Sequence, residues 1–312
     1  MIKSLRTGSL LAVSAVMLFS TYTVFNKVLV ANVSPLTLAA VSQGISIFVV
    51  ILFFGAIPEF KKIIKMPLRE VAAIIAIGVL GTVAGPVLFL KGLEHASAVN
   101  AILLAELDTV FVPLIAALWL KNKITGHEIG GGILMLGGFY YIFTEGLKIG
   151  LDFRLGDIYI ALSALCYAFS INTFKKYLHS IPSERVMIIG DTIGVLLLFF
   201  AAPTLLFMPH NFAPIFRPEI FKPLLVFSII AIALARFLWF KAVDLLPAYR
   251  ATLISLLSPL LALMLAAVVL KEPLSWYHMI GGSLVLVGMS LGVFSELGDS
   301  QEKTHQRVKQ HV

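Results

Sequence analysis

The sequence predicts an all-α membrane protein with ten transmembrane helices, arranged as two inverted five-helix repeats with both termini in the cytoplasm. Three observations lead to this fold class: the composition, an internal repeat and the distribution of basic residues. Of the 312 residues, 59% are hydrophobic and only 13% are charged, whereas soluble domains have about 45–50% and 25%. So much apolar surface is typical of a chain that crosses the bilayer several times.

The internal repeat indicates a duplicated membrane unit. Residues 91–138 align with residues 241–288 at a constant offset of 150 without a gap, and 14 of these 48 positions are identical. The matched positions include Lys121 with Lys271. Because the aligned segments lie within apolar stretches too long for a soluble core, the repeated unit is transmembrane.

Polar loops divide the chain into ten apolar runs, each near the roughly 20 residues that a bilayer requires. We expect helices at 9–31, 35–57, 70–93, 97–119, 126–146, 156–178, 184–207, 223–245, 247–270 and 276–295. The first run is longer than a signal-peptide core and lacks a small-x-small cleavage site, so we expect it to stay attached.

The loop charges predict the topology. An even number of spans places both termini on one side, and that side receives 16 of the Lys and Arg residues, against seven on the other. The positive-inside rule therefore places both termini in the cytoplasm. Each repeat holds an odd number of helices, so the two copies are inverted. We predict repeats over 8–146 and 156–295, followed by a disordered cytoplasmic tail over 296–312.

Several runs resemble the EamA-type module of the drug/metabolite transporter superfamily. They are Leu18-Phe19-Ser20 to Asn26-Lys27, Ser34-Pro35-Leu36-Thr37, Gly92-Leu93-Glu94-His95-Ala96, Gly130-Gly131-Gly132, and in the second copy Leu270-Lys271-Glu272-Pro273-Leu274 and Gly281-Gly282. The resemblance covers about residues 8–295 and implies a ten-helix bundle whose central cavity moves small metabolites or amino acids. Ser42-Gln43 departs from the arginine that many members carry there.

Three ionisable residues lie at expected mid-membrane positions: Glu106, Asp108 and Arg236. A charge at this depth costs about 2.5–3.5 kcal/mol, so each should face the bundle interior. We expect Arg236 to hold an anionic group of the substrate and Glu106 to bind a proton or the substrate amine. The alternative is a buried Glu106–Arg236 pair that fixes helix packing. Glu106 and Asp108 should point to different sides of one helix.

The repeat alignment favours the functional interpretation of these charges. Glu106 aligns with Leu256, and Arg236 aligns with Pro86. An ion pair inherited from the ancestral module should occur in both copies, whereas residues that recognise an asymmetric substrate should occur once. Asp191 is a weaker candidate, because it lies about two turns from the expected cytoplasmic end of its helix.

Polar and aromatic residues of the first and sixth helices form a second candidate group: Tyr22, Asn26, Tyr167 and Asn172. Amides and aromatic rings suit a zwitterionic or partly aromatic metabolite. Hydrogen bonding between helices is the alternative role for the same side chains.

Prolines and glycines predict bends and close contacts. Pro113 and Pro259 should interrupt their helices, although they are not at equivalent positions of the repeat. The glycines at 130–132, 137–138, 281–282 and 288 should allow helices to approach closely.

The sequence contains no phosphate-binding loop, no His/Cys metal spacing and no nucleophile elbow. We therefore expect neither an enzyme nor a cofactor. The leading hypothesis is a secondary transporter in the plasma membrane, an exporter of amino acids or other metabolites that works by proton coupling or facilitated diffusion. The alternatives are an uptake permease or exchanger for an anionic metabolite and, in another class, a membrane-bound enzyme or scaffold. The expected partners are a small-molecule substrate and the lipid bilayer, with no nucleic acid, and the chain should be a monomer or homodimer.

Overall fold

The computed structural model describes residues 2–54, 66–122, 124–147, 154–205, 207–246 and 248–291, and no β-strand occurs within these ranges. The first half contains α1 (Ile2–Ser20), α2 (Tyr22–Val30), α3 (Pro35–Phe54), α5 (Leu68–Ile77), η1 (Gly78–Ala84), α6 (Gly85–His95), α7 (Ala98–Ala105), α8 (Asp108–Leu120) and α9 (Gly126–Phe143). The second half contains α10 (Leu155–Tyr177), α11 (Ser183–Phe200), α12 (Ala202–Leu205), η2 (Ala213–Phe216), α13 (Pro218–Val226), η3 (Phe227–Leu234), α14 (Ala235–Leu245), α15 (Ala248–Ser255), α16 (Leu257–Val269) and a helix at Trp276–Leu291. The tail predicted over 296–312 lies outside the described residues.

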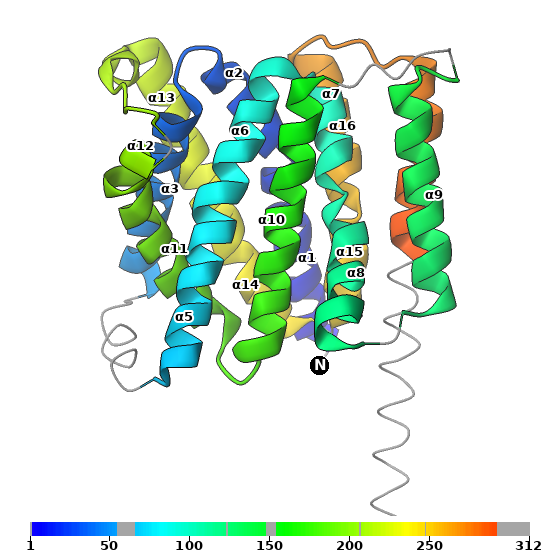
Figure 1. Cartoon of the computed structure of the whole chain (residues 1–312), viewed down its shortest axis with the longest axis horizontal. Coiled ribbons are helices and arrows are strands. Elements are labelled where there is room, and N and C mark those ends of the chain that lie inside the picture. Colours follow the sequence, from blue (N-terminus) through cyan, green and yellow to red (C-terminus); the bar gives the residue numbers. More distant parts are fainter. Residues whose placement is uncertain are drawn as a thin grey trace, which may run out of the picture.

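The helices stand side by side in a bundle (Figure 1). Among the described residues, six helical stretches are long and apolar enough to cross a bilayer, and shorter apolar helices lie at Leu253–Val269 and Trp276–Leu291. Large apolar side chains point outwards, including Phe53, Leu118 and Val268, which are 73%, 77% and 75% exposed. Such a surface is stable against lipid and unfavourable in water.

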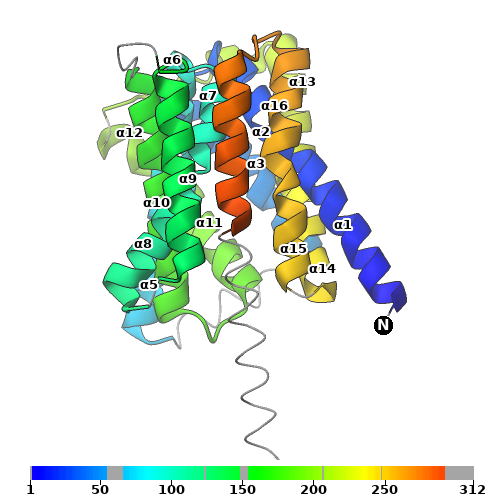
Figure 2. The same ribbon diagram turned by 90° about the vertical axis from the view of Figure 1, so that its right-hand side faces the viewer.

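Two glycine contacts demonstrate that the repeats are inverted. A Cβ added to Gly138 of α9 would lie 2.5 Å from the carbonyl oxygen of Gly281, and one added to Gly288 would lie 2.5 Å from that of Gly131. From Gly131 to Gly138 the residue numbers rise along α9, while those of their contact partners fall from Gly288 to Gly281. The two helices are therefore antiparallel (Figure 2). Gly131 and Gly281 are repeat equivalents, as are Gly138 and Gly288. The prediction of close helix contact is confirmed for these four glycines. It is wrong for Gly130, Gly132 and Gly137, where an added Cβ would meet nothing within 4 Å.

The other helix contacts also occur in matched pairs. α6 packs along α10, and the equivalent α14 packs along α1. η1 contacts α11, as η3 contacts α3. The equivalent helices α5 and α13 begin at opposite edges of the bundle (Figure 1). An approximate two-fold axis therefore relates the two halves, and it runs perpendicular to the helices.

Two π-helical segments occupy equivalent positions in the repeats. Adding 150 to the numbering of η1 (78–84) gives 228–234, which lies within η3. A π-helical turn contains an extra residue and is frequently found at functional sites. No feature of the sequence pattern predicted these segments.

The prediction that Pro113 interrupts its helix is wrong, because Pro113 lies within α8. The prediction for Pro259 agrees with the structure: Pro259 lies in the first turn of α16, and the helix is broken at 256, in the turn before it. In the first repeat the break lies at 106–107, between α7 and α8. These breaks are repeat equivalents. At the first break the N–H groups of Glu106 and Leu107 bond three residues back, which ends the α-helical ladder.

The first expected helix is also divided, at Thr21 between α1 and α2. The hydroxyls of Ser20 and Thr21 donate to the carbonyls of Met17 and Leu18, each over 2.7 Å. Hydroxyl groups that bond to the backbone three residues back compete with the helical pattern and bend it.

Candidate functional site

An ion pair lies near the middle of the bundle. Arg236 stands in the first turn of α14, directly after η3, and its Nη1 donates to Oδ2 of Asp191 in α11 over 2.6 Å. The side chains of Arg236 and Asp191 remain 21% and 15% exposed. Charge-assisted pairs of this length are strong, and both side chains keep some accessible surface.

Two buried polar side chains extend the pair to four helical segments. The Thr82 hydroxyl, in η1, donates to Oδ1 of Asp191 over 2.6 Å. Arg236 Nη2 donates to Oε1 of Gln43, in α3, over 3.4 Å. Thr82 and Gln43 are 1% and 4% exposed. Both repeats therefore contribute to one polar cluster, which we call the central cluster: Gln43, Thr82, Asp191 and Arg236.

Glycines bring η1 and α11 together at this cluster. A Cβ added to Gly78 would lie 2.5 Å from the carbonyl oxygen of Gly190, and one added to Gly194 would lie 2.5 Å from Cβ of Thr82. Only glycine permits so close an approach of the two backbones. The short distance between Thr82 and Asp191 follows from this contact.

Two predicted tyrosines lie beside the central cluster. Tyr22 of α2 packs against the rings of Phe89 and Phe227, with centroids 5.8 and 5.6 Å away. Tyr167 of α10 packs on Gly85, where an added Cβ would lie 2.9 Å from its Cζ. Both tyrosines are near enough to Arg236 to interact with its charge. They come from α2 and α10, so each repeat contributes one of the two tyrosines.

The two predicted asparagines have different surroundings. Asn26 lies one turn from Tyr22 and is 1% exposed, and its Nδ2 has no hydrogen-bond partner among the described residues. Asn172 is fully buried, and its Nδ2 donates to the carbonyls of Val112, over 3.1 Å, and Ala168, over 2.9 Å. Asn172 thus joins α10 to α8, which matches the interhelical alternative.

The alternative that Arg236 pairs with Glu106 is wrong, because the partner of Arg236 is Asp191. Glu106 lies at the break between α7 and α8, and Asp108 begins α8. The expectation that these two carboxylates point to different sides of one helix stays a prediction, and it assumed a continuous helix, whereas the helix is interrupted between them. Oδ1 of Asp108 accepts the hydroxyl of Thr109 over 3.2 Å.

Asp191, the weaker candidate in the sequence, is the partner of Arg236, and no sequence pattern pointed to Thr82. One available signal was the position of Asp191 in an apolar run beside Gly190 and before Gly194, because small residues mark the close contacts of membrane helices. In the described part of the chain, no group of three or more His, Cys, Asp or Glu side chains is placed to hold a metal ion.

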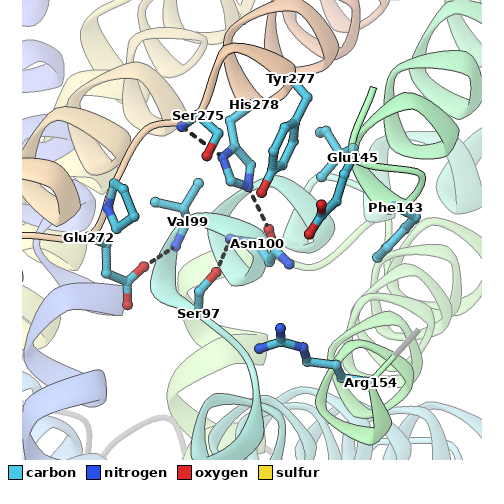
Figure 3. Close-up of a pocket in the computed structure, with 12 residues that line it drawn as sticks. Ser97, Val99, Asn100, Phe143, Glu145, Arg154, Glu272, Ser275, Tyr277 and His278 are labelled. Atoms are coloured by element: carbon cyan, nitrogen blue, oxygen red, sulfur yellow. Dashed lines mark hydrogen bonds between the residues drawn. The ribbon is translucent and has the colours of Figure 1, made fainter. Parts of the chain in front are cut away.

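A second polar region lies at the upper edge of the bundle in Figure 1, between the repeats. It surrounds a pocket of about 180 Å³ (Figure 3) whose lining includes Asn100, Glu145, Arg154, Glu272 and His278. The first two belong to the first repeat and the last three to the second. This pocket is distinct from the central cluster.

The chain resembles known proteins along nearly its whole length. The model of the EamA-like transporter family matches residues 6–144 and 154–294. An uncharacterized transporter of Synechocystis sp. is 23% identical over 259 residues, spanning 81% of this chain and 74% of that protein. One of Methanothermobacter thermautotrophicus is 22% identical over 304 residues, spanning 90% and 84%.

A solved crystal structure has the same fold. It superposes with a TM-score of 0.63 at 18% identity and covers 91% of this chain and 94% of its own. The family match confirms the resemblance seen in the sequence, and the apolar helices agree with it. The chain is therefore a multi-pass protein of the plasma membrane that belongs to the EamA-like transporter family.

Proposed function

We propose that this protein is a secondary transporter that exports a small zwitterionic metabolite, such as an amino acid, by alternating access around the central cluster. In this proposal ten helices cross the membrane, and both termini face the cytoplasm. The observation that carries the proposal is the partly exposed Arg236–Asp191 pair near the middle of the bundle.

The pair is complementary to a zwitterion. A substrate carboxylate can take the place of Asp191 at the Arg236 guanidinium, while the substrate ammonium takes the place of Arg236 at Asp191. Each buried charge then exchanges one partner for another and is never left unpaired, which would cost several kcal/mol. Tyr22 and Tyr167 supply the adjoining wall for the remainder of the molecule.

The repeat alignment supports a role in recognition. Arg236 aligns with Pro86, and Asp191 aligns with Val41. Neither charge is duplicated, as expected for groups that hold an asymmetric substrate. By contrast, the π-helical segments and the helix breaks do occur in both repeats. We propose that these local irregularities let the two halves exchange conformations around the site.

Glu106 is the proposed proton-coupling residue, and Asp108 is its neighbour. Both carboxyl groups lie at the break between α7 and α8, and Glu106 forms no salt bridge among the described residues. A membrane carboxyl group without a basic partner is a common proton carrier in transporters.

An anion uptake permease or exchanger is the competing function, suggested by Arg236. The contact with Asp191 argues against it, because the charge of Arg236 is already neutralised. A purely anionic substrate would have to leave Asp191 unpaired.

The test is transport by the purified full chain in proteoliposomes. Each amino acid of a panel is compared with its decarboxylated amine and its deaminated acid, with and without a pH gradient. The wild type should carry the zwitterions. R236M and D191N should each lower their flux by about tenfold or more, the effect of losing one charge-assisted contact. R236M should lower the flux of the amines least, because they lack the carboxylate that binds Arg236. D191N should lower the flux of the acids least, because they lack the ammonium group that binds Asp191.

The matched control is R217M, because Arg217 is an exposed arginine at the start of α13. Its flux should equal that of the wild type. Transport of the acids alone by the wild type would establish the anion carrier instead. Unchanged zwitterion flux in R236M would overturn the proposed site.

A further inference from the structure

We infer that Glu272 is the gating residue of the upper edge, a positioning residue that holds the two repeats together there and must release for that edge to open. The inference rests on the proposed alternating-access function. Glu272 follows α16 in the second repeat, and its carboxylate accepts the backbone N–H of Ala98 over 2.9 Å and of Val99 over 3.0 Å. These two residues begin α7 of the first repeat.

The first N–H groups of a helix lack partners within the helix and carry the positive end of its dipole. A carboxylate placed there forms charge-assisted hydrogen bonds. Ser97 already caps the next free position, because its side chain accepts the N–H of Asn100 over 3.0 Å. Glu272 therefore completes the cap of α7 from the opposite repeat, so opening at this edge leaves the start of α7 without its partner.

Lys27 holds the other side of the same corner. Its Nζ donates to the carbonyls of Leu93 and Ala96, each over 2.6 Å, at the end of α6. The α6–α7 corner is thus held by a cation at the helix end and an anion at the helix start. Lys27 and Glu272 are also close enough to attract each other. Both contacts match the polarity of the helix dipoles.

A neutral contact joins the two repeats at the same edge. His278 Nδ1 accepts the backbone N–H of Ser275 over 3.2 Å, so the ring proton resides on Nε2 and is donated to Oδ1 of Asn100 over 3.1 Å (Figure 3). His278 belongs to helix 276–291 and Asn100 to α7. Three contacts from other parts of the chain therefore converge on one corner of the first repeat.

The lower edge has no equivalent set in the sequence. At the offset of 150, Glu272 aligns with Asn122 and His278 aligns with Glu128. Glu128 instead caps its own helix, since its Oε2 accepts the N–H of Thr125 over 2.7 Å. At these two aligned positions, therefore, the lower edge does not repeat the charged gate. Breaking it should shift the equilibrium towards opening at that edge, whereas changing Asn122 should not.

The repeat provides matched distance probes. Spin labels at the exposed positions Glu94 and Leu274 span the upper edge, and labels at their equivalents Asp244 and Ile124 span the lower edge. Double electron–electron resonance on the full chain measures both distances in the absence of a substrate. The labels are introduced into a C166S background that retains the wild-type circular dichroism spectrum. E272Q should raise the ratio of open to closed molecules at 94–274 about tenfold, the effect of losing charged hydrogen bonds.

Controls separate the gate from a structural defect. N122A should leave the 94–274 distances unchanged. E272D, which keeps the charge, should restore part of the closed population. If E272Q does not fold, K27M is measured instead and should open the same edge. An unchanged 94–274 distribution in a folded E272Q or K27M protein would overturn the inference. Widening in E272Q, together with no flux by the wild type in proteoliposomes, would keep the gate and reject the proposed transport function.

Discussion

Thr82 donates its hydroxyl to Asp191 over 2.6 Å, from the π-helical segment of the first repeat to α11 of the second. The same carboxylate holds Arg236, so Thr82 orients one member of the ion pair through the oxygen that Arg236 leaves free. The geometry of the central cluster therefore depends on a neutral side chain that touches neither the cation nor, in our proposal, the substrate.

T82V tests this orientation. Valine has nearly the same shape but cannot donate, so Asp191 loses one partner and becomes less well fixed. We expect the KM for a zwitterionic substrate to rise several-fold while the protein still folds, as measured by proteoliposome flux and thermal unfolding. T192V is the control, because Thr192 donates to Ile188 in its own helix. Equal KM values for T82V and wild type would contradict this role.

E106Q tests proton coupling. Glutamine keeps the size of the side chain and removes the exchangeable proton, so an imposed pH gradient should no longer drive net flux, while exchange of labelled for unlabelled substrate continues. Both rates are measured in the same proteoliposomes. E219Q, at the exposed start of α13, should behave as the wild type. A pH-driven flux that survives in E106Q would remove Glu106 from this role.

G138A tests the antiparallel contact between the repeats. The added methyl group would lie 2.5 Å from the carbonyl oxygen of Gly281, so the helices must separate. Overpacking of this kind costs about 1–3 kcal/mol, and the apparent Tm in detergent should fall. G137A, on the same helix, meets nothing within 4 Å and should keep or raise the Tm. Similar Tm values for the two variants would place the contact elsewhere.

N172L tests the assignment of Asn172 to packing. Leucine removes the hydrogen bonds to Val112 and Ala168, and we expect a loss of stability of about 1–2 kcal/mol with an unchanged order of substrate preference. Thermal unfolding and the substrate panel measure the two effects. T173V is the control, since Thr173 bonds within its own helix. An unchanged Tm with an altered substrate order would instead assign Asn172 to the binding site.

The positions of the helices and the inversion of the repeats followed from the sequence alone. Apolar length sets where a chain can cross a bilayer, and an odd number of helices per repeat inverts the second copy whatever the details of packing. The glycines were recognised in the same way, because small residues have few other uses on membrane helices.

The partner of Arg236 and the breaks in the helices were decided by tertiary contacts. Helical periodicity gives the face of a residue, but the choice between Glu106 and Asp191 depends on which helices adjoin α14, and only the tertiary structure places Asp191 of α11 against Arg236. The π-helical segments and the break near 106 carry no sequence signature comparable to Pro259, which follows the break at 256. They arise because packing against neighbouring helices outweighs the small cost of displacing a few backbone hydrogen bonds.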